Sequence, residues 1–237
     1  MTIRNQYHII VENKTVYIPL PVIQGEDMLG AEPFTPEREK ELLDYFSKRR
    51  WAERNIAVLA LGIQTGFRIS EILSIRRRDI IKNGKMVERV HVRKLYMKGG
   101  MSEKNSNIHG RAMLLTNDTK KILQTLLDKL DEQGYTEPEH FLFQTQRAGN
   151  YALQKNGYWR VLWDAKKVLG WTWKLSTHSM RKTFADRVYS NLMEKGNADG
   201  LRILQAGLGH ANINNTIKYL AFKDDELTDA IHDVFGE

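Results

Sequence analysis

The feature that most constrains the fold is the interval between apolar residues, which is three or four along most of the chain. The series from Ile56 through Leu59 to Ile63 is the clearest case, and such residues share one face of an α-helix. The interval approaches two around 90–96 and 112–115, as in strands with one buried face. We therefore predict a mainly α fold with one small antiparallel β-sheet.

Capping and turn residues indicate where the helices begin and end. Thr35 fits an N-cap, Pro36 fits the first helical position, and Gly134 fits the residue just past a helix. The predicted helices span about 36–49, 52–65, 70–75, 118–133, 151–169, 179–193, 200–206, 214–220 and 224–234. The polar stretch 98–110, rich in Gly, Ser and Asn, is predicted to be a hairpin loop between the strands.

The chain is expected to form one compact domain, residues 33–237, behind an N-terminal arm or linker, residues 1–32. In the arm, the β-branched runs 8–11 and 15–20 flank a polar stretch and predict a hairpin. Since 41% of the 237 residues are hydrophobic, the chain can bury one good core.

Composition excludes several classes of protein. There are 36 Lys and Arg against 29 Asp and Glu, a formal charge of +7, which favours a polyanionic partner. No cysteine is present, which rules out disulfides, thiolate zinc sites and a cysteine nucleophile. The longest apolar run, 56–63, is far shorter than the roughly 20 residues of a membrane span, and the N-terminus does not have the pattern of a signal peptide. We expect a cytoplasmic protein.

The first of three motifs is TGFRISE, residues 65–71, in which a turn delivers Arg68 beside a helix N-terminus with Glu71 close enough to orient it. A guanidinium held there could bind a phosphate in bidentate fashion. The alternative is a surface Arg–Glu pair. The second motif is HSMR, in which His178 and Arg181 share one helical face; its alternative is a solvated helix face.

The third motif is GLGH, residues 207–210, followed nine residues later by Tyr219. The glycines permit a tight turn that presents His210. The alternative is that Tyr219 is a packing residue whose hydroxyl is satisfied.

In series, the strings TGFRISEIL, HSMRKTFA and LGHANINNTIKYL resemble the tyrosine recombinase (phage integrase) family over about 34–237. The resemblance implies the catalytic-domain fold of DNA breaking and rejoining enzymes, and strand cleavage that requires no metal, ATP or other cofactor. It implies that Arg68 and Arg181 bind the non-bridging phosphate oxygens. Tyr219 would be the nucleophile that forms a 3′-phosphotyrosyl intermediate, His178 would act in proton transfer, and His210 would hydrogen-bond the phosphate.

These roles agree with elementary chemistry. Attack on a phosphodiester builds negative charge on its oxygens, which fixed cations stabilise. A phenol, with a pKa of about 10, needs activation at neutral pH. The departing 5′ oxygen needs a proton, which the resemblance assigns to a lysine between the two strands. Lys98 and Lys104 both fit, and Lys98 is preferred because it stands at a strand end.

The resemblance implies double-stranded DNA recombination sites as partners, with a homotetramer formed on two DNA sites, and it leaves room for an accessory DNA-bending protein. A terminal helix within 221–235 would dock on a neighbouring protomer. No membrane partner is expected. The basic runs 48–50, 76–78, 93–94 and 166–167 are candidate phosphate contacts, and the alternative for them is a solvated face.

The sequence is also compatible with other interpretations. Relatives usually carry a separate core-binding domain before the catalytic one, so the chain is either a short recombinase or a fragment of a longer integrase. A type IB topoisomerase would use similar chemistry to relax DNA. A non-catalytic DNA-binding or regulatory module would keep the fold without cleavage.

Overall fold

The structure, a computed structural model, describes residues 6–11, 14–19, 30–92, 110–210, 212–217 and 219–220, with side chains from residue 30 onward. The chain divides into two compact units, Met1–Gly30 and Ala31–Glu237. The first holds an antiparallel hairpin of β1 (Gln6–Val11) and β2 (Lys14–Pro19). The predicted hairpin is thereby confirmed.

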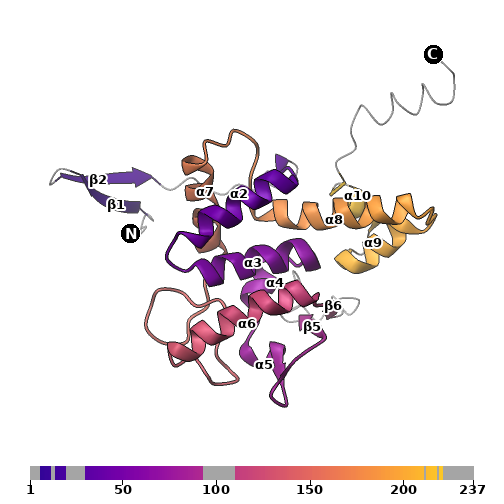
Figure 1. The fold of residues 1–237 in the computed structure, drawn as a ribbon. Coiled ribbons are helices and arrows are strands. Elements are labelled where there is room, and N and C mark those ends of the chain that lie inside the picture. Colours follow the sequence, from indigo (N-terminus) through magenta and orange to yellow (C-terminus); the bar gives the residue numbers. More distant parts are fainter. Residues whose placement is uncertain are drawn as a thin grey trace. The chain divides into compact units, whose positions relative to one another are not determined.

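The second unit is mostly helical and carries small antiparallel sheets, which confirms the predicted fold class (Figure 1). Its helices are α2 (Pro36–Ser47), α3 (Ala52–Thr65), α4 (Ile69–Leu73), α5 (Arg77–Ile80), α6 (Asn117–Glu132), α7 (Lys155–Val168), α8 (Thr177–Glu194), α9 (Gly200–Leu208) and α10 (Ile213–Ile217). Its strands are β3 (Ile81–Lys82), β4 (Lys85–Met86), β5 (Arg89–Val92) and β6 (Arg111–Leu114). None of the described helices combines the length and apolar character of a membrane span.

Helix α3 is the centre of the unit, packing against α2, α4, α6 and α8 (Figure 1). Because neighbours surround it, burial is not confined to the predicted stripe. Ala57, Val58 and Leu61 are fully buried, whereas Ile56 and Ala60 are only partly so. The main core forms around this helix, and its C-terminal end lies where the three motifs meet.

The β structure of the described residues is divided among three two-stranded sheets rather than gathered in one. The β5–β6 pair matches the predicted strands, with Val92 opposite Arg111. The predicted continuation at 95–96 and the connector 98–110 fall outside the described residues except for Gly110. The β3–β4 hairpin was not predicted. It turns on Asn83 and Gly84, whose φ angles of 51° and 72° suit a primed hairpin turn.

Two predicted helices differ from those in the structure by three residues or more at one end. Helix α7 starts at Lys155 rather than about 151, because Ala152 forms a β-bridge with Gln144 and keeps the chain extended. Helix α10 ends at Ile217, and Tyr219 follows in a turn. The backbone N–H of Tyr219 donates to the Thr216 carbonyl at 2.9 Å. The helix predicted at 224–234 lies outside the described residues.

Candidate active site

The end of α3 delivers Arg68. Gly66 ends that helix with φ +60°, in the left-handed region, and Arg68 then becomes the N-cap of α4. Glu71 accepts the Arg68 backbone N–H through Oε2 at 2.8 Å and the guanidinium Nη1 through Oε1 at 2.9 Å. The Glu71 side chain is fully buried and that of Arg68 is 23% exposed. The predicted orientation of Arg68 by Glu71 is confirmed, and the pair is not a surface pair.

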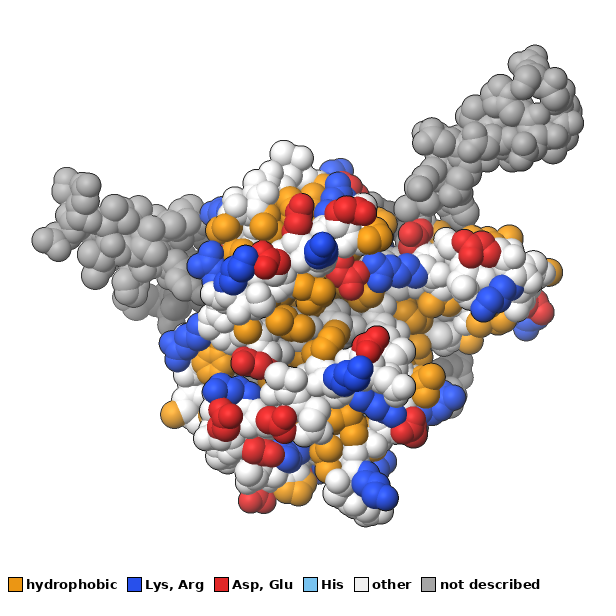
Figure 2. Space-filling model, in the orientation of Figure 1, with side chains coloured by type: hydrophobic (Ala, Val, Ile, Leu, Met, Phe, Trp, Pro, Cys, Tyr) orange, Lys and Arg blue, Asp and Glu red, His pale blue; other side chains and the backbone are white. Residues whose placement is uncertain are grey.

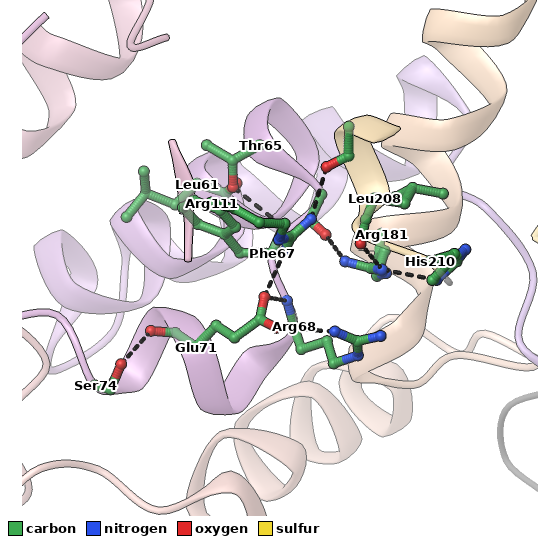
Figure 3. A network of polar contacts seen from close by, with 12 residues as sticks. Leu61, Thr65, Phe67, Arg68, Glu71, Ser74, Arg111, Arg181, Leu208 and His210 are labelled. Atoms are coloured by element: carbon green, nitrogen blue, oxygen red, sulfur yellow. Dashed lines mark hydrogen bonds and ion pairs between the residues drawn. The ribbon is translucent and has the colours of Figure 1, made fainter. Parts of the chain in front are cut away.

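Arg111, at the start of β6, is the arginine that sequence reasoning missed (Figure 3). Its Nη2 lies 2.5 Å from Glu71 Oε2, and its Nη1 donates to the Gly207 carbonyl at 2.7 Å. The guanidinium also lies over the Phe67 ring, 4.9 Å from the centroid. No motif marks this residue, because its two hydrogen-bond partners lie 40 and 96 positions away.

Arg181 is buried in the middle of the site, with 1% of its surface exposed. Its Nη1 donates to the Gly66 carbonyl, and its Nη2 donates to the Leu208 carbonyl at 2.7 Å. Nη2 also lies 2.8 Å from His210 Nε2 (Figure 3). The HSMR motif is therefore not on a solvated helix face at this position.

The contacts of His210 determine its tautomer. A guanidinium has only donors, so Nε2 must accept from Arg181 and the proton resides on Nδ1, which lies 3.0 Å from Thr216 Oγ1. Burial, helped by the charges of Arg181 and Arg68, lowers the His210 pKa to about 3. The imidazole is therefore neutral at physiological pH.

His178 stands in the first turn of α8, one turn before Arg181. Its backbone N–H donates to the Ser176 hydroxyl at 3.1 Å, the cap of that helix. Burial lowers its pKa to about 4, with Lys155 and Arg181 adding to the effect. A neutral imidazole of this kind can accept a proton.

Tyr219 lies against the same cluster. Its ring centroid is 5.2 Å from that of His210 and 5.3 Å from the Arg181 Cζ. The residue is 5% exposed and packs in a smaller second core with Phe184 and Leu208. Its hydroxyl is buried without a hydrogen-bond partner in the described part of the chain. A packing tyrosine with a satisfied hydroxyl does not fit this observation.

The site concentrates positive charge. Arg68, Arg111 and Arg181 surround Glu71, the carboxylate that bonds two of them, which gives this group a formal charge of +2. Burial would raise the Glu71 pKa, but Arg111 and Arg68 outweigh it and lower that pKa. Burial, with the charges of Arg68 and Arg111, lowers the Arg181 pKa to about 9.

Three polar atoms in this cluster are buried with no partner among the described residues: Arg111 Nε, Arg181 Nε and the Tyr219 hydroxyl. An unpaired buried donor costs about 1–3 kcal/mol, which a hydrogen-bond acceptor placed beside it would recover. No group of three His, Asp or Glu suited to a metal occurs in the described ranges.

The other predicted residues either lie outside the described residues or bond partners elsewhere. Lys98 and Lys104, the two candidates for the acid, lie outside the described residues. In the basic run 76–78, Arg76 and Arg78 bond Glu139 and Arg77 bonds Asp131. On the face drawn in Figure 2, acidic and basic side chains are interspersed.

Comparison with known proteins gives consistent relatives. The profile of the phage integrase family matches residues 32–226. Tyrosine recombinase XerA of Pyrococcus furiosus is 27% identical over 198 residues, which is 83% of this chain and 59% of the relative. Tyrosine recombinase XerC of Rickettsia prowazekii is 32% identical over 180 residues, 76% of this chain and 51% of the relative. The chain thus spans between half and two thirds of the length of these relatives.

Solved structures share the fold. A crystal structure of XerA recombinase superposes with a TM-score of 0.62 at 21% identity, covering 86% of this chain and 65% of that one. XerH site-specific recombinase bound to a palindromic difH substrate gives the same TM-score and identity, covering 93% and 58%. With the family profile matched over most of its length, this chain belongs to the phage integrase family.

Proposed function

We propose that this protein is a site-specific DNA recombinase that cleaves and rejoins strands through a 3′-phosphotyrosyl intermediate on Tyr219. The observation that carries the proposal is that Arg181 and His210 contact a tyrosine whose buried hydroxyl has no described partner, with Arg68 close enough to lower the pKa values of both. Residues 33–237 would be the catalytic domain and 1–32 an arm or linker.

In the cleavage step, the Tyr219 oxygen attacks the scissile phosphorus, a new P–O bond forms, and the bond to the 5′ oxygen breaks. The phenol gives up its proton, and His178, neutral at pH 7, is the group proposed to take it. The 5′ oxygen leaves as a hydroxyl after protonation by Lys98 or Lys104. A 5′ hydroxyl of a partner strand then attacks the phosphotyrosine, which restores the diester, breaks the bond to the Tyr219 oxygen and returns a proton to that oxygen, so the bond energy is conserved without ATP or metal.

The two predicted arginines stabilise the transition state. Arg68 is held by Glu71 and Arg181 by backbone carbonyls, so neither must reorganise while charge develops on the phosphate oxygens. The two charges are close enough that Arg68 lowers the Arg181 pKa. Their role is to bind the non-bridging oxygens.

His210 can donate a hydrogen bond to the phosphate if it changes tautomer. Its Nε2 now accepts from Arg181, and donation to a phosphate requires a proton on Nε2. The Thr216 hydroxyl at Nδ1 both donates and accepts, so it supports either tautomer. Exchange of the Arg181 contact for a phosphate contact would accompany the change.

Two observations favour recombination over a type IB topoisomerase or a non-catalytic module. The relatives are named tyrosine recombinases, and the five predicted catalytic residues that the structure describes are all present. The proposed partners are double-stranded recombination sites, a homotetramer across two sites, and an accessory DNA-bending protein. The proposed location is the cytoplasm, at the nucleoid.

A nicked suicide substrate tests the proposal. Protein is incubated with nicked DNA carrying candidate sites, with a chelator and without ATP, and denaturing gels reveal a covalent adduct. We expect an adduct with the wild type and none with Tyr219→Phe, which keeps the packing and removes the nucleophile. Binding without any adduct would indicate a binding module. Relaxation of a plasmid that carries no matching second site would indicate a topoisomerase.

A further inference from the structure

We propose that Arg111 is a positioning residue for strand cleavage, linking the carboxylate that orients Arg68 to the turn that presents His210. The inference rests on the proposed function of this site. Arg111 is not part of any of the three sequence motifs, and it acts through its neighbours rather than on the phosphate.

The first link is to Glu71. That carboxylate has two tasks: Oε1 holds the Arg68 guanidinium at 2.9 Å, and Oε2 accepts the Arg68 backbone N–H at 2.8 Å. Arg111 bonds Oε2 at 2.5 Å, so it fixes the rotation of the carboxylate about its last bond. Without that contact, the Oε1 atom that aims the Arg68 side chain is free to turn.

The second link is to the end of α9. The other Arg111 nitrogen donates to the Gly207 carbonyl at 2.7 Å. At Gly209, where φ is +64°, an added Cβ would lie 2.7 Å from Arg111 Cδ, so the arginine stem rests directly on the turn before His210. One planar guanidinium therefore spans the two sides of the site, which a lysine with a single nitrogen cannot do.

The chain offers a matched control in Arg54, on α3. Arg54 is 5% exposed and Arg111 8%. Each donates to one distant backbone carbonyl, Arg54 to that of Gln144 at 2.8 Å. The other hydrogen-bond partner of Arg54 is the Asn55 side chain, and its guanidinium lies over the Trp51 ring. None of these contacts involves the three motifs. Loss of Arg54 reports what losing any buried arginine does to the fold.

The experiment compares Arg111→Met and Arg111→Lys with Arg54→Met and Arg54→Lys. For each variant the adduct rate on a nicked substrate is measured at saturating DNA, alongside the Kd for DNA and the melting temperature. Arg111→Met is expected to lower the saturated rate at least about tenfold, toward the roughly 100-fold that an ångström of misplacement costs, with Kd changed less than about threefold. Arg111→Lys should recover part of that rate. The Arg54 variants should keep the wild-type rate at saturation.

A wild-type rate in folded Arg111→Met overturns the inference and leaves the proposed function standing. An equal loss in Arg54→Met reduces Arg111 to a structural role and also overturns it. If Arg111→Met does not fold, Gly209→Ala displaces the arginine without removing it, and a wild-type rate in that variant and in Arg111→Lys again overturns the inference. A wild-type protein that never forms an adduct refutes the proposed function itself, and the inference with it.

Discussion

Replacing Glu71 by Gln removes the buried negative charge between Arg68 and Arg111 and changes almost nothing in shape. One carboxylate oxygen becomes an NH2 group, so a donor then faces the N–H donor of an arginine. The present oxygen-to-nitrogen distances are 2.9 Å to Arg68 and 2.5 Å to Arg111. Breaking a buried ion pair from one side costs about 3–5 kcal/mol. For a domain of this size, 1 kcal/mol corresponds to about 2–4 °C, so the expected drop in melting temperature is about 6–20 °C.

Glu88→Gln is the matched control. Lys120 lies 2.5 Å from Glu88, the same separation as Arg111 from Glu71, but the Glu88 side chain is 75% exposed. An exposed pair contributes less than about 1 kcal/mol. Thermal and urea unfolding at pH 7, followed by circular dichroism, measure both variants. Losses for Glu71→Gln no larger than those for Glu88→Gln would refute the view that burial makes the difference.

Two further predictions concern pH and packing. The pKa values of His178 and His210 are lowered by burial to about 4 and about 3, so the unfolded chain binds more protons below about pH 6.5. The contribution of each histidine to stability is therefore fully present above that pH and is lost by up to about 1.4 kcal/mol per pH unit as pH drops toward 4. Urea unfolding at pH 7 and pH 5 measures this loss of unfolding free energy. His210→Gln should make the difference between the two pH values smaller. Gly66→Ala would place a methyl 2.4 Å from Phe184 Cδ1 and should cost about 1–3 kcal/mol beyond the cost of Gly134→Ala, where nothing lies within 4 Å. Equal unfolding free energies for the two glycine variants would contradict the packing argument.

The sequence predicts most helices of this fold because the residues that begin and end them are local signals. Thr35 and Pro36 mark the start of α2, whose N-cap hydroxyl accepts from the Arg38 N–H. The β3–β4 hairpin also has a local signal, Asn83-Gly84, which favours a two-residue hairpin turn. The late start of α7 was not marked, since it depends on pairing between Ala152 and Gln144, which only tertiary structure creates.

The candidate site divides along the same line. The motifs predicted Arg68, Arg181, His210 and the Glu71 contact, because each is tied to a turn or a helical face. Arg111 was not predictable in this way, since a lone arginine at the start of a strand acquires its partners only when three distant segments meet. The catalytic roles of these residues are harder to predict than their positions, because the roles depend on contacts with DNA.

The carbonyls at the end of α9 hold two arginines, Gly207 binding Arg111 and Leu208 binding Arg181. A helix C-terminus carries a partial negative charge of about one half, produced by aligned peptide dipoles rather than by an ionised group. Such a counter-charge makes burial of Arg181 tolerable without cancelling its unit charge. It also cannot be titrated away or compete for a proton. Held this way, the guanidinium keeps most of its long-range attraction for a polyanion while staying fixed in place.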